Sequence, residues 1–341
     1  MSLNQDFETA GNASAPSLHV VMSGGGSEFE FLHGAIQEIS VYSITGMSGT
    51  SAGAIAAALY VSGYNTSGRA EGLRRLKNFS NDLRLSGWHY LLARANPSFI
   101  AFSAEERSRL WTSVLGLSHD FMRAVGMKSP IKTAIENLLH KHIPDIDKLN
   151  QGPMTIAVNT ITIDRKIGTT NHHIHQSGSI TFETIIASAS LEHMGGTFLN
   201  GEIHNDGGHD RNGSNEVAQA DQRATDIMVI STYSHDHAEE SKPKKGLGIK
   251  QGQLHSDMLR LYFDDSNTKF LHSIAPPKSE DDKARMSNDP IHLMERCKAG
   301  RACAQQWKRD HAHKLGNSDS YQFSEVVMDR VLNAGLGKLA A

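Results

Sequence analysis

The sequence predicts an α/β fold with a central, mostly parallel β-sheet. Apolar stretches at 18–22 and 41–47 have the length and composition of buried strands, and each ends at a glycine-rich turn. An amphipathic segment at 29–39 follows the first turn, and an alanine-rich segment from 52 to about 60, closed by Gly63, follows the second. Because strand, turn and helix occur twice with short connections, this region forms a βαβα unit, whose strands run parallel.

Periodic patterns further along the chain predict more elements of the same fold. The predicted helices cover 104–117, 131–143 and 182–190, and the predicted strands cover 154–158 and 226–232. Residues 161–175 are typical of two strands joined by a turn, and Asn200-Gly201 is a strong hairpin dipeptide. We expect surface loops over the polar stretches 236–250 and 275–290, and helices in most of the remainder.

Composition and charge bear on the class of protein. The 341 residues, 38% of them hydrophobic, are enough for one large domain or two small ones. The longest nearly apolar stretch, 52–61, is too short to span a bilayer, which needs about 20 apolar residues. Lysine and arginine total 34 against 37 for aspartate and glutamate, and this balance gives no reason to expect a nucleic-acid partner.

The N-terminus and the cysteines bear on the cellular compartment. Residues 1–16 are polar and are predicted to form a mobile tail; they lack the basic and apolar regions of a secretory signal. The two cysteines, Cys297 and Cys303, provide no disulfide framework and favour a reducing compartment. We therefore expect a cytoplasmic location, although export by a route without a recognisable N-terminal signal would leave the same sequence.

The pentapeptide Gly49-Thr50-Ser51-Ala52-Gly53 matches the G-x-S-x-G pattern of a nucleophile elbow. In such an elbow the serine lies on a sharp strand-to-helix turn, and a Cβ at either glycine would collide with neighbouring chain. The turn exposes the serine hydroxyl at the N-terminus of the next helix, whose dipole favours developing negative charge. An apolar strand precedes this pattern and an alanine-rich helix follows it, so we interpret Ser51 as a nucleophile between the elbow glycines Gly49 and Gly53.

The glycines Gly24, Gly25 and Gly26 end the preceding strand of the same unit. Both turns of a parallel unit emerge at the C-terminal edge of the sheet, where such folds bind ligands. Three glycines present unhindered backbone N–H groups, which are the donors of an oxyanion hole and are worth roughly 3–4 kcal/mol each in a transition state. A phosphate-binding loop is disfavoured, because Ser27, Glu28 and Phe29 follow instead of the third fingerprint glycine.

A nucleophilic serine needs a base, and Asp206 is the candidate. This aspartate follows the Asn200-Gly201 hairpin and precedes Gly207 and Gly208. At the end of a strand, its carboxylate can point toward a neighbouring loop. Taken alone, an Asp-Gly pair is more often an ordinary turn, so the assignment depends on the other two motifs.

Together, the three motifs resemble those of patatin-like phospholipases: an apolar strand into Gly-Gly-Gly, an elbow 25 residues later and a distant Asp-Gly-Gly. The stretch ITGMSGTSAGAIAAALYVSG is similar to the family's elbow and helix, and IIASASLEHMGGTFLNGEIHNDGG to the segment that leads to its catalytic aspartate. The segment 294–316 also resembles the tail of some bacterial members. The resemblance implies a three-layer α/β/α fold, with a catalytic domain over 17–235 and C-terminal loops and helices over 236–341 packed on it.

The resemblance also implies a lipid acyl hydrolase of the phospholipase A or lysophospholipase type, without metal or cofactor. Ser51 would attack the ester and form an acyl-enzyme, and Asp206 would accept its proton. The N–H groups of the three glycines would hold the oxyanion, and water activated by the same carboxylate would release the acyl group. The implied partner is a lipid or other acyl ester, with peripheral membrane contact during catalysis. The sequence leaves the acyl donor, the regiochemistry, the oligomeric state and any activator open.

The chain departs from the family pattern at two places. After the glycines the family usually carries a small residue, a lysine or arginine and a glycine, where this chain has Ser27, Glu28 and Phe29. The exchange at Glu28 removes a positive charge near the oxyanion loop. The family's proline-containing run before the aspartate is replaced by the residues 191–196. Both departures leave the proposed dyad intact and bear on substrate choice and activity.

Two other functional hypotheses remain open. The first is an esterase with a Ser-Asp-His triad, for which the histidines His209, His235 and His237 follow Asp206 in the required chain order. The second is a non-catalytic relative that binds lipid or a partner protein, for which the altered loop at Glu28 is the support. A serine-directed phosphonate should react covalently with an active dyad and should not react with a non-catalytic binding protein.

Histidines are unusually frequent, with 19 in the chain, and three of them gather at 172–175. On a strand, alternate residues share a face, so His173 and His175 could bind one metal ion, with His172 beside them. The sequence places no carboxylate convincingly near them. We therefore favour a solvated strand edge over a metal site.

Overall fold

The computed structural model describes residues 15–86, 130–164, 169–190, 195–209, 213–234, 268–277 and 290–321. Its strands are β1 (Ser17–Met22), β2 (Ser43–Gly49), β3 (Thr155–Asp164), β4 (Thr169–Gln176), β5 (Thr197–Leu199), β6 (Glu202–Asp206), β7 (Asp226–Ile230) and β8 (Phe270–Ile274). The longer helices are α1 (Phe29–Ile39), α2 (Ala52–Ser67), α3 (Arg69–Ser86), α6 (Pro130–His142) and α11 (Pro290–His311). The shorter helical elements are α7 (Asp147–Asn150), α8 (Phe182–Ser188), α9 (Asn215–Ala220), η1 (Gly26–Glu28), η4 (Gly207–His209) and η7 (Ala312–Lys314).

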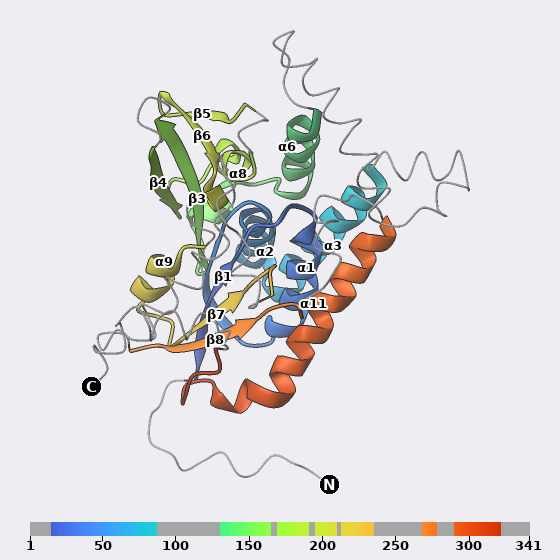
Figure 1. Ribbon diagram of the computed structural model, residues 1–341, viewed down its shortest axis with the longest axis vertical. Coiled ribbons are helices and arrows are strands. Elements are labelled where there is room, and N and C mark those ends of the chain that lie inside the picture. Colours follow the sequence, from blue (N-terminus) through green and yellow to red (C-terminus); the bar gives the residue numbers. More distant parts are fainter. Residues whose placement is uncertain are drawn as a thin grey trace.

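The strands form one eight-stranded sheet in the order β5-β6-β3-β2-β1-β7-β8, with β4 paired to β3 outside this path (Figure 1). The strands β3, β2, β1, β7 and β8 pair in parallel. The strands β4 and β6 pair with β3 in the antiparallel sense, and β5 pairs with β6 in the same way. The predicted α/β fold with a mostly parallel sheet is confirmed.

The N-terminal βαβα unit is present as predicted, with one difference in the second helix. α1 has the predicted bounds, but α2 continues through Gly63 and ends before Gly68, whose φ is +80°. The reason lies in the packing of α2 against α3. A Cβ on Gly63 would lie 2.7 Å from the Cα of Gly72, so the glycine permits close helix contact instead of ending the helix.

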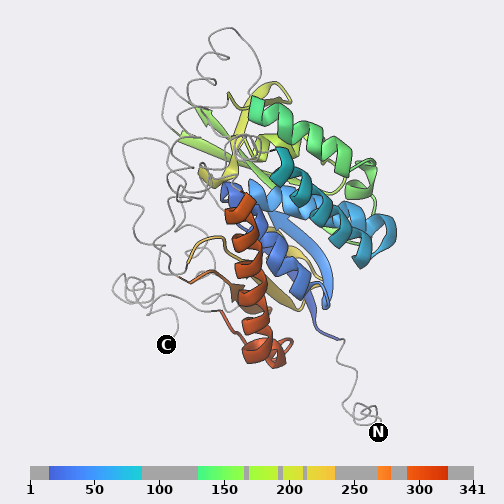
Figure 2. The ribbon, with the colours of Figure 1, turned by 90° about the vertical axis from the view of Figure 1, so that its right-hand side faces the viewer.

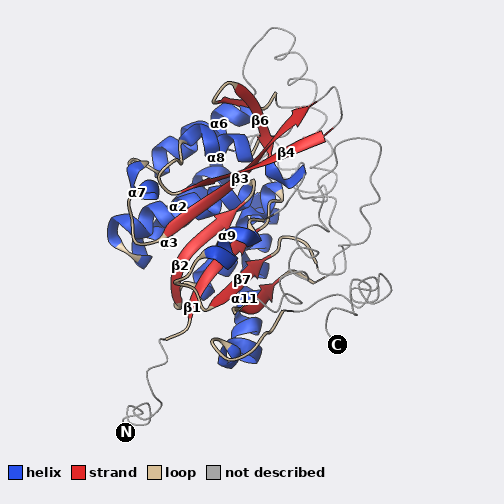
Figure 3. Cartoon of the chain, turned by 90° about the vertical axis from the view of Figure 1, so that its left-hand side faces the viewer, coloured by secondary structure: helices blue, strands red, loops and turns tan. Residues whose placement is uncertain are grey.

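Side chains alternate between the two faces of the sheet and form a core on each. On one face, β1 residues such as Val20 and Met22 join the large core formed with α1, α2 and α11. On the other face, Val21 and Val229 pack against Ala218 of α9. Figure 2 shows the long helices covering the first face, and Figure 3 shows α9 in front of the strands on the other. Helices on both faces make the fold a three-layer α/β/α arrangement.

The C-terminal helix α11 packs along α1 through two glycines that face each other's backbones. A Cβ on Gly34 would overlap the carbonyl oxygen of Cys297, and a Cβ on Gly300 would overlap that of Phe31. Figure 2 shows the two helices side by side. Since α1 follows the glycine turn after β1, α11 supports the helix that leads out of that turn.

Some elements differ from the prediction or fall outside the described residues. The strand β8 was not predicted, because Phe270–Ile274 is a short apolar run that periodicity alone does not distinguish from a helix segment. The predicted helix at 104–117 and the predicted loop at 236–250 lie outside the described residues. No helix within the described stretches combines the length and the apolar character needed to cross a membrane.

Candidate active site

Ser51 lies on a strained turn between β2 and α2. Its backbone has φ 54° and ψ −121°, which is a left-handed φ that only one other described non-glycine residue, Asn200 of the β5–β6 hairpin, shares. The flanking glycines are required by close backbone contacts. A Cβ on Gly49 would overlap the backbone of Gly53, and a Cβ on Gly53 would lie 2.5 Å from the carbonyl oxygen of Met22. This local geometry is that of a nucleophile elbow.

Hydrogen bonds from distant parts of the chain hold the elbow in place. The Ser51 N–H donates to the Ser188 hydroxyl at 2.9 Å, and the Thr50 N–H donates to the Met22 carbonyl at 3.2 Å. The Asn159 side chain donates to the Thr50 hydroxyl at 3.1 Å. Neither Ser188 nor Asn159 carries a recognisable sequence signal, because each reaches the elbow only through the tertiary fold.

The register of β3 explains why Asp206 lies beside Ser51. Along one edge of β3, the last residue of β2, Gly49, pairs with Val158 in parallel. Two residues further along the same strand, Thr160 pairs with Asp206, the last residue of the antiparallel β6. The two strands therefore end toward each other, about 7 Å apart along β3. The turn that carries Ser51 and the carboxyl group of Asp206 meet in the space between these ends.

The carboxyl group of Asp206 is almost fully buried, with the residue 1% exposed. One carboxylate oxygen accepts a hydrogen bond from the Gly208 N–H at 2.8 Å. Burial raises the pKa of Asp206 to about 6, and the Gly208 N–H and the nearby Ser51 side chain oppose the rise. The carboxyl group of Asp206 thus lies close to Ser51 and ionises near pH 6.

The three glycines follow β1, next to the elbow, because Met22 pairs with Gly49. Gly26 has φ +62°, and a Cβ on Gly25 would lie 2.7 Å from the Thr232 hydroxyl oxygen. The Thr232 hydroxyl donates to the carbonyl of Gly24 at 2.6 Å. The loop therefore depends on glycine for its shape, and a hydrogen bond joins it to the residues that follow β7.

Glu28 lies directly after this loop, and an arginine of α11 balances the charge of its carboxylate. The residue is 2% exposed, and its carboxylate accepts hydrogen bonds from both Nε and Nη2 of Arg296 in α11, the Nε contact being 2.8 Å. The Arg296 guanidinium also lies 5.3 Å from the centre of the Phe31 ring. The positive charge that the sequence lacks at position 28 is thus present in space, carried by a residue 268 positions away.

We expect Arg296→Met to destabilise the fold and to lower any activity of the site. The change leaves the Glu28 carboxylate buried without its guanidinium partner. Breaking a buried ion pair costs about 3–5 kcal/mol, and about 1–3 kcal/mol is expected here because the Arg296 side chain is 18% exposed. Urea unfolding at pH 7.5 measures the loss.

The matched control is Arg301→Met on the same helix. The Arg301 side chain is 51% exposed, and its Nε lies 3.9 Å from Oε1 of Glu38. Its removal should therefore change the free energy of unfolding by less than about 1 kcal/mol. The double variant Glu28→Gln/Arg296→Met should recover much of the loss. Equal effects of the two arginine changes would contradict a special role for the Glu28–Arg296 pair.

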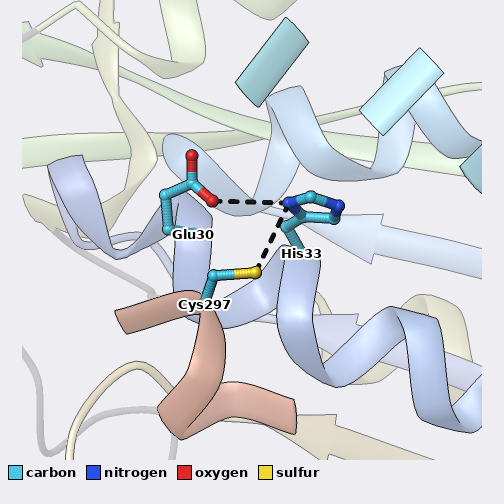
Figure 4. A group of neighbouring side chains, drawn as sticks. All are labelled: Glu30, His33 and Cys297. Carbon is cyan, nitrogen blue, oxygen red and sulfur yellow. Dashed lines mark hydrogen bonds and ion pairs between the residues drawn. The ribbon is translucent and has the colours of Figure 1, made fainter. Parts of the chain in front are cut away.

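A second polar cluster joins α1 to α11 (Figure 4). His33 Nδ1 lies 3.3 Å from Glu30 Oε2 and 3.8 Å from Cys297 Sγ, and the three groups are close enough to suggest metal ligands. The Glu30 carboxylate, however, already accepts hydrogen bonds from Ser80 at 2.6 Å and Arg84 at 2.8 Å. We interpret the cluster as a buried network that fixes the two helices.

The structure describes the histidine cluster at 172–175 and does not describe the side chains of the three triad candidates. His235, His237, the stretch 191–194 and the side chain of His209 lie outside the part of the chain that the structure describes. The histidines of 172–175 lie on β4, and the structure corrects the expectation that no carboxylate lies near them. β6 brings His204 and Glu202 to His173.

A cavity of about 320 Å³ lies away from the candidate site. It is lined by residues such as His19, Thr155 and Asp221, which lie at the amino-terminal ends of β1 and β3 or before β7. Ser51 lies at the carboxyl-terminal end of β2, on the opposite edge of the sheet. The cavity is therefore separate from the candidate active site.

The fold and the site define a class, the α/β proteins that carry a serine on a nucleophile elbow beside a buried acid. A family model for patatin-like phospholipases matches residues 20–208, which is more than half of the chain and includes all three motifs. The chain belongs to the patatin-like phospholipase family, and this family supports a lipid hydrolase activity. No curated protein matched the sequence.

Solved structures that align with this chain include proteins of bacteria and of humans. VipD from Legionella pneumophila aligns with a TM-score of 0.35 and 12% identity over 95% of this chain and 74% of its own. The type III effector ExoU of Pseudomonas aeruginosa aligns with a TM-score of 0.32 and 17% sequence identity over 86% of this chain. Human GIVD cytosolic phospholipase A2 aligns with a TM-score of 0.32 and 10% sequence identity over 87% of this chain. This chain spans 53% of the ExoU chain and 60% of the human one.

Proposed function

We propose that the protein is a lipid acyl hydrolase of the phospholipase A or lysophospholipase type, with Ser51 as nucleophile and Asp206 as base. The observation that carries the proposal is the meeting of the strained Ser51 turn and the buried Asp206 carboxyl group at the facing ends of β2 and β6. Membership of the patatin-like phospholipase family supports the lipid substrate class.

The proposed reaction begins when the Asp206 carboxylate takes the proton of the Ser51 hydroxyl as its oxygen attacks the ester carbonyl. The N–H groups of Gly24, Gly25 and Gly26 and the N-terminus of α2 stabilise the negative charge on the former carbonyl oxygen. The tetrahedral intermediate collapses to an acyl-enzyme on Ser51. The alcohol portion leaves with the proton that Asp206 returns.

In the second half, Asp206 takes a proton from water as the water oxygen attacks the acyl-enzyme. The intermediate again collapses, the Ser51 oxygen regains the proton, and the fatty acid leaves. One carboxylate thus serves as base and acid in both halves. The pKa of Asp206, raised to about 6, suits this alternation at neutral pH.

We also propose that the protein touches lipid surfaces near the β5–β6 hairpin. Phe198 and Ile203 are cross-strand partners on this hairpin and are 70% and 57% exposed. They lie on the strand pair whose last residue is Asp206. An exposed aromatic and aliphatic pair at this place is suited to peripheral contact with acyl chains.

The test is the release of fatty acid by the full chain from phosphatidylcholine, lysophosphatidylcholine and triacylglycerol in mixed micelles. A soluble p-nitrophenyl butyrate assay runs in parallel, because it reports the chemistry without a lipid surface. Ser51→Ala supplies the blank for each substrate. We expect release from at least one phospholipid above this blank. Turnover of the soluble ester alone would contradict the lipid assignment, and no turnover of any ester would favour a non-catalytic binding protein.

We expect activity to fall as the pH drops through about 6. The base must be ionised, and burial raises the pKa of Asp206 to about 6, so protonation removes the active form below that value. The measurement is kcat/KM for the soluble ester from pH 4.5 to 8.5 in buffers containing EDTA. A profile that stays flat down to pH 5 would contradict Asp206 as the base.

A further inference from the structure

Three strands bring two histidines and a glutamate together beside the candidate site. β3 lies between β4 and β6, so that His173 is opposite Thr160 on one side and His204 is opposite Thr162 on the other. The imidazole rings of His173 and His204 reach across β3, and their centres are 4.7 Å apart. Glu202 precedes His204 by two residues on β6 and therefore projects from the same face of the sheet.

The ligand-type atoms of these three residues converge. One nitrogen of each imidazole and a carboxylate oxygen of Glu202 all lie within 4.8 Å of one another. Ligands around a tetrahedral zinc ion, at about 2.0–2.2 Å from the metal, are separated by roughly 3.4 Å. Glu202 is exposed and its side chain can rotate, so a small movement closes the remaining difference.

Two threonine hydroxyls of β3 orient the rings. Thr162 Oγ1 lies 3.0 Å from His173 Nε2, and Thr160 Oγ1 lies 2.8 Å from His204 Nδ1. When each of these nitrogens donates its proton to the threonine oxygen, the opposite nitrogen of the ring carries a free lone pair. Metal-binding histidines are held in this way, with the second ring nitrogen hydrogen-bonded to a neighbouring group.

Thr160 also links a third histidine, His175, to the cluster. Thr160 Oγ1 lies 2.9 Å from His175 Nε2, so the hydroxyl that accepts from His204 can donate to His175. Among the described residues, no lysine or arginine forms an ion pair with Glu202, and its charge is available to a cation. His175 thus supports the arrangement without being a ligand.

We propose that His173, Glu202 and His204 bind one divalent transition-metal ion, with zinc as the best match. Two imidazoles and one carboxylate are a ligand set typical of zinc sites that leave a fourth position to water. Magnesium and calcium prefer all-oxygen ligands and are not expected to bind here. The site is independent of the hydrolase chemistry, since none of its three ligands belongs to the Ser51–Asp206 pair.

The test is a titration of the full-length protein, stripped with EDTA and free of any affinity tag. Isothermal titration calorimetry with Zn²⁺ at pH 7.5 measures stoichiometry and Kd, and Co²⁺ reports ligand geometry through its visible absorption. Glu202→Gln removes the charge at an exposed position, and His173→Gln removes an imidazole. His313→Gln, at an exposed histidine of η7, controls for adventitious binding by surface histidines.

The expected result is one equivalent of Zn²⁺, with affinity at least about tenfold weaker in Glu202→Gln and His173→Gln and unchanged in His313→Gln. Thermal unfolding of the metal-free variants should match the wild type, which separates ligand loss from misfolding. Mg²⁺ should give no saturable binding. Absence of saturable Zn²⁺ binding would overturn the proposal, and so would one-to-one binding that both ligand variants retain.

Discussion

Replacing Ser51 by alanine should lower kcat/KM for ester hydrolysis by at least about 10³-fold, because the group that forms the acyl-enzyme is lost. The fold should remain, since the Ser51 N–H that bonds to Ser188 belongs to the backbone and is retained. The positive φ at this position disfavours alanine about as much as serine. Steady-state kinetics on the soluble ester and far-UV circular dichroism measure the two effects.

A matched control for this change is Ser190→Ala. Ser190 is a buried serine whose hydroxyl donates to the Ile186 carbonyl and lies 3.1 Å from the Thr197 hydroxyl. Its backbone carbonyl accepts from the Asp206 N–H, and this contact is retained in alanine. Loss of the hydroxyl should cost about 1–2 kcal/mol of stability and leave most of the activity. Activity that survives Ser51→Ala but not Ser190→Ala would contradict the assignment of the nucleophile.

Replacing Asp206 by asparagine should have the second large effect. The change should lower the activity and raise the stability of the fold. Activity should fall by about 10²–10⁴-fold, because the amide cannot accept the serine proton. Stability at pH 8 should rise by about 1–3 kcal/mol, because the ionised carboxylate is buried and its pKa is raised to about 6. Urea unfolding and ester kinetics on the same preparations measure both.

The sign follows from proton linkage. A carboxyl group whose folded-state pKa lies above its unfolded value makes the fold less stable as the pH rises between the two values. The gain from Asp206→Asn should therefore be complete above about pH 7 and should vanish below about pH 3, where the wild-type carboxyl group is protonated in both states. A variant that is less stable than wild type at pH 8 would contradict the destabilising burial of this charge.

Much of the fold could be predicted because its signals are local. The βαβα unit, the three glycines and the elbow are consecutive stretches whose periodicity and glycine spacing identify strands, turns and helices. The short strand β8 and the extension of α2 beyond Gly63 depended on what packs against them. Gly63 resembles a helix end in sequence and is a contact with Gly72 in space.

The candidate site was predictable in its motif residues and not in its supporting residues. Ser51 and Asp206 carry recognisable neighbours, whereas Ser188 and Asn159 are ordinary residues until the register of β3 brings them to the elbow. The same limit applies to charge. Glu28 appeared to remove a positive charge, and only the packing of α11 on α1 supplies Arg296.

The carboxylate near the histidine cluster is another feature that the sequence alone did not predict. The cluster at 172–175 lacked a carboxylate in sequence, because Glu202 and His204 are about 30 residues away on β6. Antiparallel pairing of both β4 and β6 with β3 joins them. Long-range strand pairing is the information that a single sequence pattern does not contain.

The most direct test of the central claim is covalent labelling of Ser51 by a long-chain fluorophosphonate. Intact-mass spectrometry and peptide mapping of the full chain locate the adduct. We predict one adduct on Ser51 in the wild type, much slower labelling in Asp206→Asn, and none in Ser51→Ala. An unlabelled wild-type protein, or an adduct that persists in Ser51→Ala, would contradict a Ser51 nucleophile activated by Asp206.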